Sequence, residues 1–100
     1  MENSYGNIPS SQIQKQKKYF YGSCIDLLYK YDEGYPLLDA RIQTLINQIS
    51  GSNKLFGYQA EVLSIVAFLE HAREHPSQFR KDVLDAANLV DKLKDGDTDV

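Results

Sequence analysis

Four stretches of apolar residues at helical spacing, separated by short breaks, dominate this chain of 100 residues. The breaks fall at Gly34, at 51–57 and at Pro76, where glycine or proline interrupts the pattern. Apolar residues that recur every three or four positions place one face of a helix against a core. Because short connections reverse the direction of the chain, the pattern predicts an all-α fold, an antiparallel up-down-up-down four-helix bundle.

The predicted bundle lies between two polar ends. Residues 1–10 are interpreted as a flexible N-terminal arm, because they hold Gly, Asn, Ser and Pro without periodicity. The bundle itself is predicted over 11–95, and residues 96–100 form an acidic tail. Pro36 is expected in the first turn of the second helix, where a missing amide hydrogen costs nothing. The predicted helices are 11–32, 36–50, 57–75 and 77–94.

The third predicted helix is apolar over most of its circumference. Val62, Ile65 and Leu69 mark one face, and Leu63 and Phe68 extend it widely. A helix that is apolar all round is typical of a buried element. We therefore expect this helix at the centre of the bundle, in contact with the second and fourth helices.

Composition and charge narrow the class of protein. With 42% hydrophobic and 25% charged residues, the chain matches ordinary globular domains. Its net charge of −3 argues against a nucleic-acid partner, whose phosphates attract Lys and Arg. The polar start holds no secretory signal, and no apolar run reaches the ~18–20 residues that a membrane span requires. We therefore expect a cytoplasmic protein.

Residue types with catalytic chemistry are sparse. Cys24 is the only cysteine, and its place on the apolar face of the first helix predicts a small buried side chain. His71, Glu74 and His75 match the H-x-x-E-H order of some zinc proteases. Pro76 follows at once, so the simpler interpretation is a pair of histidines near a helix C-terminus. We expect no catalytic residue, no metal and no cofactor, and a small metalloenzyme is kept as a third hypothesis.

Tyrosines gather along the first helix and the turn after it: Tyr19, Tyr21, Tyr29, Tyr31 and Tyr35. Tyrosine suits both the rim of a small bundle and a protein interface. Both interpretations stay open, and the second predicts a cytoplasmic helical adaptor or regulator that binds a protein partner through this face. Lys15, Lys17 and Lys18 precede the tyrosines, and their simplest interpretation is a solvated face. As a functional site they favour peripheral contact with an anionic membrane over nucleic-acid binding.

The middle of the chain resembles a known family. Residues 37–50 read LLDARIQTLINQIS, and Asn53-Lys54-Leu55 and then YQAEVL at 58–63 follow. Over residues 35–75 this pattern resembles the enterocin A-type immunity proteins of class IIa bacteriocin producers. The overall length, the acidic tail and the four-helix layout are similar too.

The resemblance implies a cytoplasmic four-helix bundle that protects its cell from a pore-forming antimicrobial peptide. In that family, protection is thought to act from inside the cell, on the complex of bacteriocin with a sugar-uptake membrane receptor. The carboxy-terminal half is held to choose which bacteriocin is neutralised. On this chain, that half is the fourth helix with its flanks, at the inner face of the membrane. Charge complementarity there points to five partner-binding residues: Arg80, Lys81, Lys92, Lys94 and Asp95.

Overall fold

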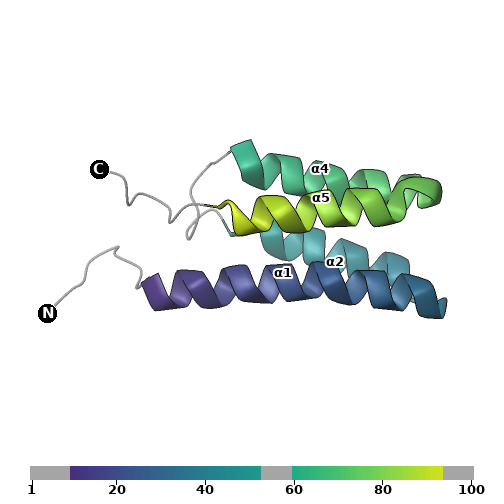
Figure 1. Cartoon of the computed structure of the whole chain (residues 1–100), viewed down its shortest axis with the longest axis horizontal. Helices are drawn as coiled ribbons and strands as arrows, with labels where there is room; N and C mark the ends of the chain where they lie inside the picture. Colours follow the sequence, from purple (N-terminus) through teal and green to yellow (C-terminus); the bar gives the residue numbers. More distant parts are fainter. Residues whose placement is uncertain (1–9, 53–59, 94–100) are drawn as a thin grey trace, which may run out of the picture.

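The computed structural model describes residues 10–52 and 60–93, which form a four-helix bundle (Figure 1). Its elements are α1 (Ser10–Glu33), α2 (Leu38–Ser50), α4 (Ala60–Glu74), the 3-10 helix η1 (Pro76–Gln78) and α5 (Phe79–Asp91). The predicted all-α fold is confirmed. Most of the predicted N-terminal arm and the whole of the acidic tail lie outside the described residues.

The four helices form a ring. α1 packs against α2 and α5, and α4 packs against the same two helices. Successive helices run in opposite directions, as Figure 1 shows. Each helix therefore has two neighbours and one outer face.

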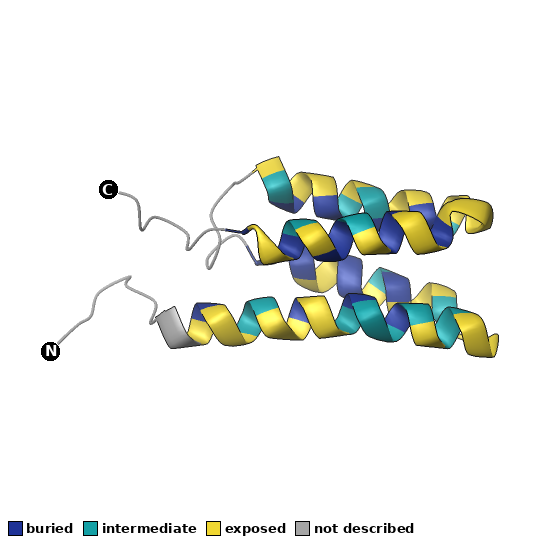
Figure 2. Cartoon of the chain, in the orientation of Figure 1, coloured by how far each residue is buried: buried dark blue, intermediate teal, exposed yellow. Residues whose placement is uncertain are grey.

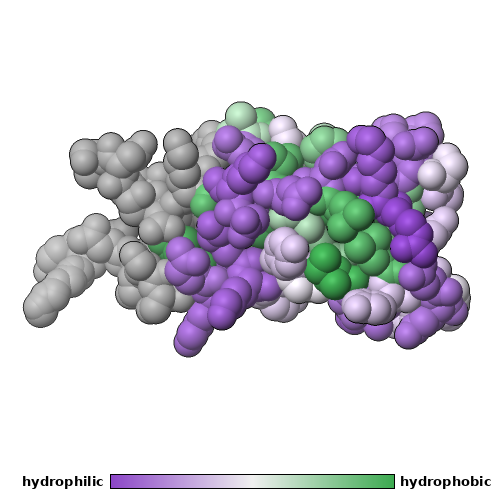
Figure 3. Space-filling model, in the orientation of Figure 1, coloured by the Kyte–Doolittle hydropathy of each residue, from purple (hydrophilic) through white to green (hydrophobic). Residues whose placement is uncertain are grey.

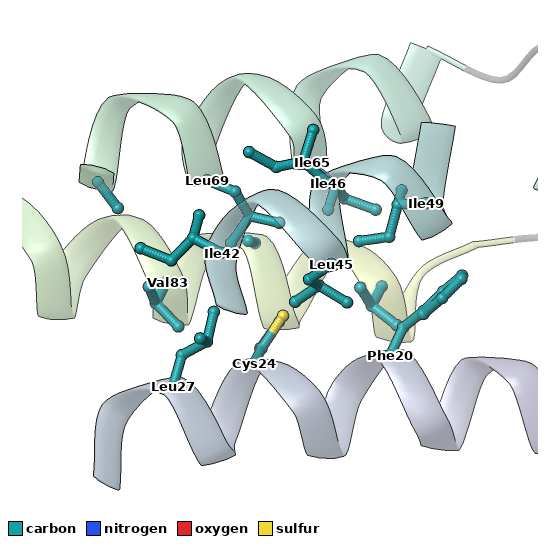
Figure 4. Close-up of a cluster of buried hydrophobic side chains, with 14 of the residues drawn as sticks. Phe20, Cys24, Leu27, Ile42, Leu45, Ile46, Ile49, Ile65, Leu69 and Val83 are labelled. Atoms are coloured by element: carbon teal, nitrogen blue, oxygen red, sulfur yellow. The ribbon is translucent and has the colours of Figure 1, made fainter. Parts of the chain in front are cut away.

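The core fills the centre of the ring with apolar side chains from all four helices, and Figure 2 shows the buried positions turned inward. Full burial of a Val, Leu, Ile or Phe side chain contributes about 1.5–3 kcal/mol to the free energy of folding. Core members that are at most 4% exposed include Phe20, Cys24, Leu27, Ile42, Leu45, Ile46, Ile49, Ile65, Leu69 and Val83 (Figure 4).

The turn between α1 and α2 is built around Gly34. Its φ of 69° lies in the left-handed region that glycine adopts without strain. The Gly34 amide donates to the Tyr31 carbonyl at 3.1 Å, and the Tyr35 amide donates to the Lys30 carbonyl at 3.0 Å. These two bonds form a Schellman motif, which satisfies the last carbonyls of α1. Because the turn continues through Pro36, α2 begins two residues later than predicted.

The connection between α4 and α5 is a 3-10 turn. Pro76 disfavours helical geometry at His75, whose φ and ψ are −128° and 79°. The turn then occupies Pro76–Gln78, so α5 starts at Phe79 and not at 77 as predicted. The α-helix ends at Asp91, where the predicted helix ran on to 94.

For α4, the predicted contacts with α2 and α5 are confirmed, but the prediction that the helix is buried over most of its circumference is wrong. The helix packs against α2 and α5 as expected. Its buried stripe is Val62, Ile65, Leu69 and Ala72, whereas Leu63 is 74% exposed. A ring of four helices covers only the inner side of each, so Leu63 on the outer side of α4 remains in solvent, whereas Phe68 is partly buried against the core.

Candidate partner-binding surface

Three of the five residues predicted to contact a partner lie on the outer face of α5 or directly after it. Arg80, Lys81 and Lys92 are all exposed. Lys94 and Asp95 lie outside the described residues. The described part of the surface therefore offers cations at both ends of α5.

Arg80 is held against α1. Its guanidinium forms an ion pair with Asp32 and lies 6.0 Å from the centre of the Tyr31 ring. Tyr31 in turn stacks on Phe79, with ring centres 4.3 Å apart and planes 9° apart. The Tyr31 hydroxyl also donates to the Pro76 carbonyl at 3.2 Å. These contacts fix the start of α5 on α1, so Arg80 has a positioning role beside any role in binding.

Lys81 points more fully into solvent. Its ammonium donates to the Asp85 carboxylate at 3.0 Å, one helical turn away, and its side chain is 71% exposed. The hydrogen bond from Lys81 to Asp85, together with the negative charge of that carboxylate, raises the pKa of Lys81. Lys81 is therefore a cation throughout the physiological pH range.

Leu84 is an exposed apolar residue of this surface, and its side chain was not predicted to be part of it. Arg80 of α5 pairs with Asp32 of α1. Leu84 lies one turn after Arg80, and Leu28 lies one turn before Asp32. Because α1 and α5 are antiparallel, both leucines continue the α1–α5 seam beyond the Arg80–Asp32 ion pair. Leu84 is 46% exposed and Leu28 is partly buried. Figure 3 shows an apolar area bordered by hydrophilic atoms where α1 and α5 face the viewer. Leu84 could have been found from the sequence, because it is an apolar residue that falls outside the core stripe of its helix.

The tyrosines do not form one face. Tyr19, Tyr21 and Tyr29 are 50%, 41% and 65% exposed, whereas Tyr31 and Tyr35 are partly buried. At about 100° per residue, Tyr21 lies about 200° around α1 from Tyr19. The exposed rings therefore point in different directions, and the tyrosine-rich face expected from the sequence is split.

His71, in the last turn of α4, faces α5. His71 Nδ1 lies 2.5 Å from Oδ2 of Asp82, a carboxylate that is only 4% exposed, and the His75 ring is 4.2 Å from that of His71. The partner of His71 is thus Asp82, which was not predicted to take part, and Glu74 is exposed. Across the described ranges, no three His, Cys, Asp or Glu side chains are grouped so as to hold a metal ion.

Cys24 is fully buried in the core, as predicted. Burial raises the pKa of its thiol from 9.0 to about 12. At neutral pH the thiol is therefore protonated, and the thiolate that nucleophilic chemistry requires does not form.

The α5 surface thus combines exposed cations with an apolar seam. Among the helices that the structure describes, none is both long enough and apolar enough to cross a membrane. Comparisons of the chain with protein-family models, with curated proteins and with solved structures find no match.

Proposed function

We propose that this protein is a bacteriocin immunity protein. It protects the producing cell from a pore-forming, class IIa-type antimicrobial peptide. It acts from the cytoplasm and without catalysis, at the inner face of the membrane, on a sugar-uptake receptor or on the receptor–bacteriocin complex. The family in this proposal comes from the resemblance of residues 35–75 to enterocin A-type immunity proteins, and the surface comes from the geometry of α5.

The observation that carries the choice of surface is the combination of Leu84 with Lys81 and Lys92 on the outer side of α5. Protein interfaces typically place an apolar anchor at the centre and charges at the rim. The anchor supplies most of the binding energy, and the charges set specificity and the rate of encounter. Arg80 is engaged with Asp32 across the seam to α1, whereas Lys81 pairs with Asp85 of α5 itself, so we take Lys81 and Lys92 as the charges that a partner meets.

Protection of a sensitive strain tests the proposal. The full chain is expressed in cells that carry the receptor, and the inhibitory concentration of a panel of class IIa-type bacteriocins is measured. We expect the parent to raise that concentration for at least one peptide. The variant Lys81→Gln/Lys92→Gln should lose about tenfold or more of this protection, because it removes both lysine charges from the rim.

A matched control separates the surface from the net charge. Ser64→Glu/Ala67→Glu changes the charge by the same amount at exposed positions of α4, and it should protect as the parent does. If the parent protects against no peptide in the panel, the immunity function is wrong. If the parent protects but the lysine variant protects equally, the immunity function stands and the α5 surface is wrong.

A helical adaptor that uses α1 is the second candidate, favoured by the exposure of Tyr21 and Tyr29. The variant Tyr21→Ala/Tyr29→Ala distinguishes the two functions. An immunity protein that works through α5 keeps its protection in this variant. An adaptor loses its protein partner, because aromatic side chains are frequent anchors of interfaces.

A further inference from the structure

A groove runs between α1 and α2 and takes no part in the α5 surface. Its volume is about 550 Å³, which is within the range of small-molecule sites. Along α1 it extends from Lys18 to Asp26, a distance of about 12 Å at the rise of an α-helix. Leu27 and Leu45, each 3% exposed, form an apolar floor.

Gly22 opens this groove. It lies in the interior of α1, where glycine weakens a helix relative to alanine. Its φ is not in the left-handed region, and a Cβ built on it would meet no atom within 4 Å. Neither backbone conformation nor packing within the described residues therefore requires glycine here. What the missing side chain does is leave room above the backbone of α1 for another molecule to approach closely.

The charges of the groove differ between its two ends. At one end, Arg41 and Lys30 both approach the Asp26 carboxylate, at 3.5 and 3.8 Å, so this end is compensated. At the other end, Lys18 is exposed and makes no hydrogen bond or ion pair within the part of the chain that the structure describes. The lining holds two cations and one anion, Lys18 and Arg41 against Asp26, in a protein of net charge −3. This polarity is complementary to a ligand with one anionic head and an apolar body.

We propose that the α1–α2 groove binds a small amphiphilic carboxylate. The carboxylate lies at Lys18, and the apolar body covers Gly22 on the floor of two leucines. Ser23 and Thr44 also line the groove, along the part that the apolar body covers. This site is independent of the immunity function, since it uses neither α5 nor the α1–α5 seam.

Titration of the full chain with octanoate, below its micelle concentration, tests the site by amide chemical shifts. We expect saturable shifts centred on Gly22, Ser23 and Thr44. Gly22→Leu should weaken octanoate binding by about tenfold or more, because the new side chain fills the groove. Lys18→Gln should weaken octanoate by about threefold or more while leaving the neutral analogue octanamide unaffected.

Ala67→Leu is the matched control, since it introduces the same type of side chain at an exposed position of α4 and should bind octanoate as the parent does. If circular dichroism shows that Gly22→Leu is unfolded, Gly22→Ala replaces it. A Cβ at this position meets no atom of the protein within 4 Å, so the fold accommodates it, and the methyl group should still weaken octanoate binding measurably because it occupies the groove. The proposal is overturned if octanoate produces no saturable shifts, if the shifts lie elsewhere, or if the folded Gly22 variant binds as tightly as the parent.

Discussion

At the scale of single residues, Cys24 shows how burial controls the chemistry of a side chain. The folded thiol stays protonated up to about pH 12, whereas an exposed thiol ionises above 9.0. Between these values the folded state binds more protons than the unfolded state, so stability falls as pH rises. At about pH 10.5, ionisation of the unfolded thiol should remove about 2 kcal/mol of the free energy of unfolding.

Urea unfolding, measured across this pH range for the parent and for Cys24→Ala, checks this expectation. The alanine variant lacks the thiol but keeps the tyrosines and lysines, so the difference between the two pH slopes isolates Cys24. We expect a steeper loss of stability in the parent above pH 9.0. Equal slopes in both proteins would show that the thiol titrates normally and is not buried as described.

Asp82 and Leu84 show which single residues the sequence left unpredicted. Both adjoin Val83 in the apolar stripe of α5, yet Asp82 is 4% exposed and Leu84 is 46% exposed. Asp82 faces α4, where His71 approaches it, whereas Leu84 lies one turn after Arg80, which pairs with Asp32 of α1. The difference depends on how α5 is rotated between its two neighbours. That rotation is a property of the packed bundle, whereas the spacing of residues along α5 alone predicts only the centre of the buried stripe.

At the scale of elements, periodicity predicted the core stripes well and the ends of the helices less well. The stripe of α2, Ile42, Leu45, Ile46 and Ile49, is buried, as its spacing of three and four residues indicates. The starts of α2 and α5 were placed too early because Pro36 and Pro76 both belong to turns. Proline is compatible with a first helical turn and with a 3-10 turn alike. The choice depends on backbone hydrogen bonds that the residue type does not reveal.

α4 supports a sharp comparison within one helix, because its outer side is apolar and yet exposed. Ile65 is fully buried and Leu63 is 74% exposed. We expect Ile65→Ala to lower the free energy of unfolding by about 2–5 kcal/mol, since it removes buried methyl groups and leaves a cavity. Leu63→Ala should change it by at most about 0.5 kcal/mol. Chemical denaturation measures both, and a large loss for Leu63→Ala would mean that another surface covers it.

At the scale of the whole molecule, the topology was predictable because short connections between four amphipathic helices leave little choice. The groove between α1 and α2 was not predictable, since it requires Gly22 from one helix to lie beside Thr44 from the other. Features that belong to one helix were visible in the sequence. Features made where two helices meet, such as the groove and the His71–Asp82 contact, were visible only once the helices were placed.

Charged groups join α1 to both of its neighbours, through Arg41–Asp26 on α2 and Arg80–Asp32 on α5. All four side chains are 45–60% exposed, so water and salt screen each pair. Exposed pairs of this kind contribute about 0–1 kcal/mol each, whereas the core contributes far more. Raising NaCl from about 50 to about 500 mM should therefore lower the free energy of unfolding by less than about 2 kcal/mol. Arg41→Ala/Arg80→Ala should show a weaker salt dependence than the parent in the same urea titrations. Cooperative unfolding lost at high salt would instead mean that ion pairs, and not the apolar core, close the ring of helices.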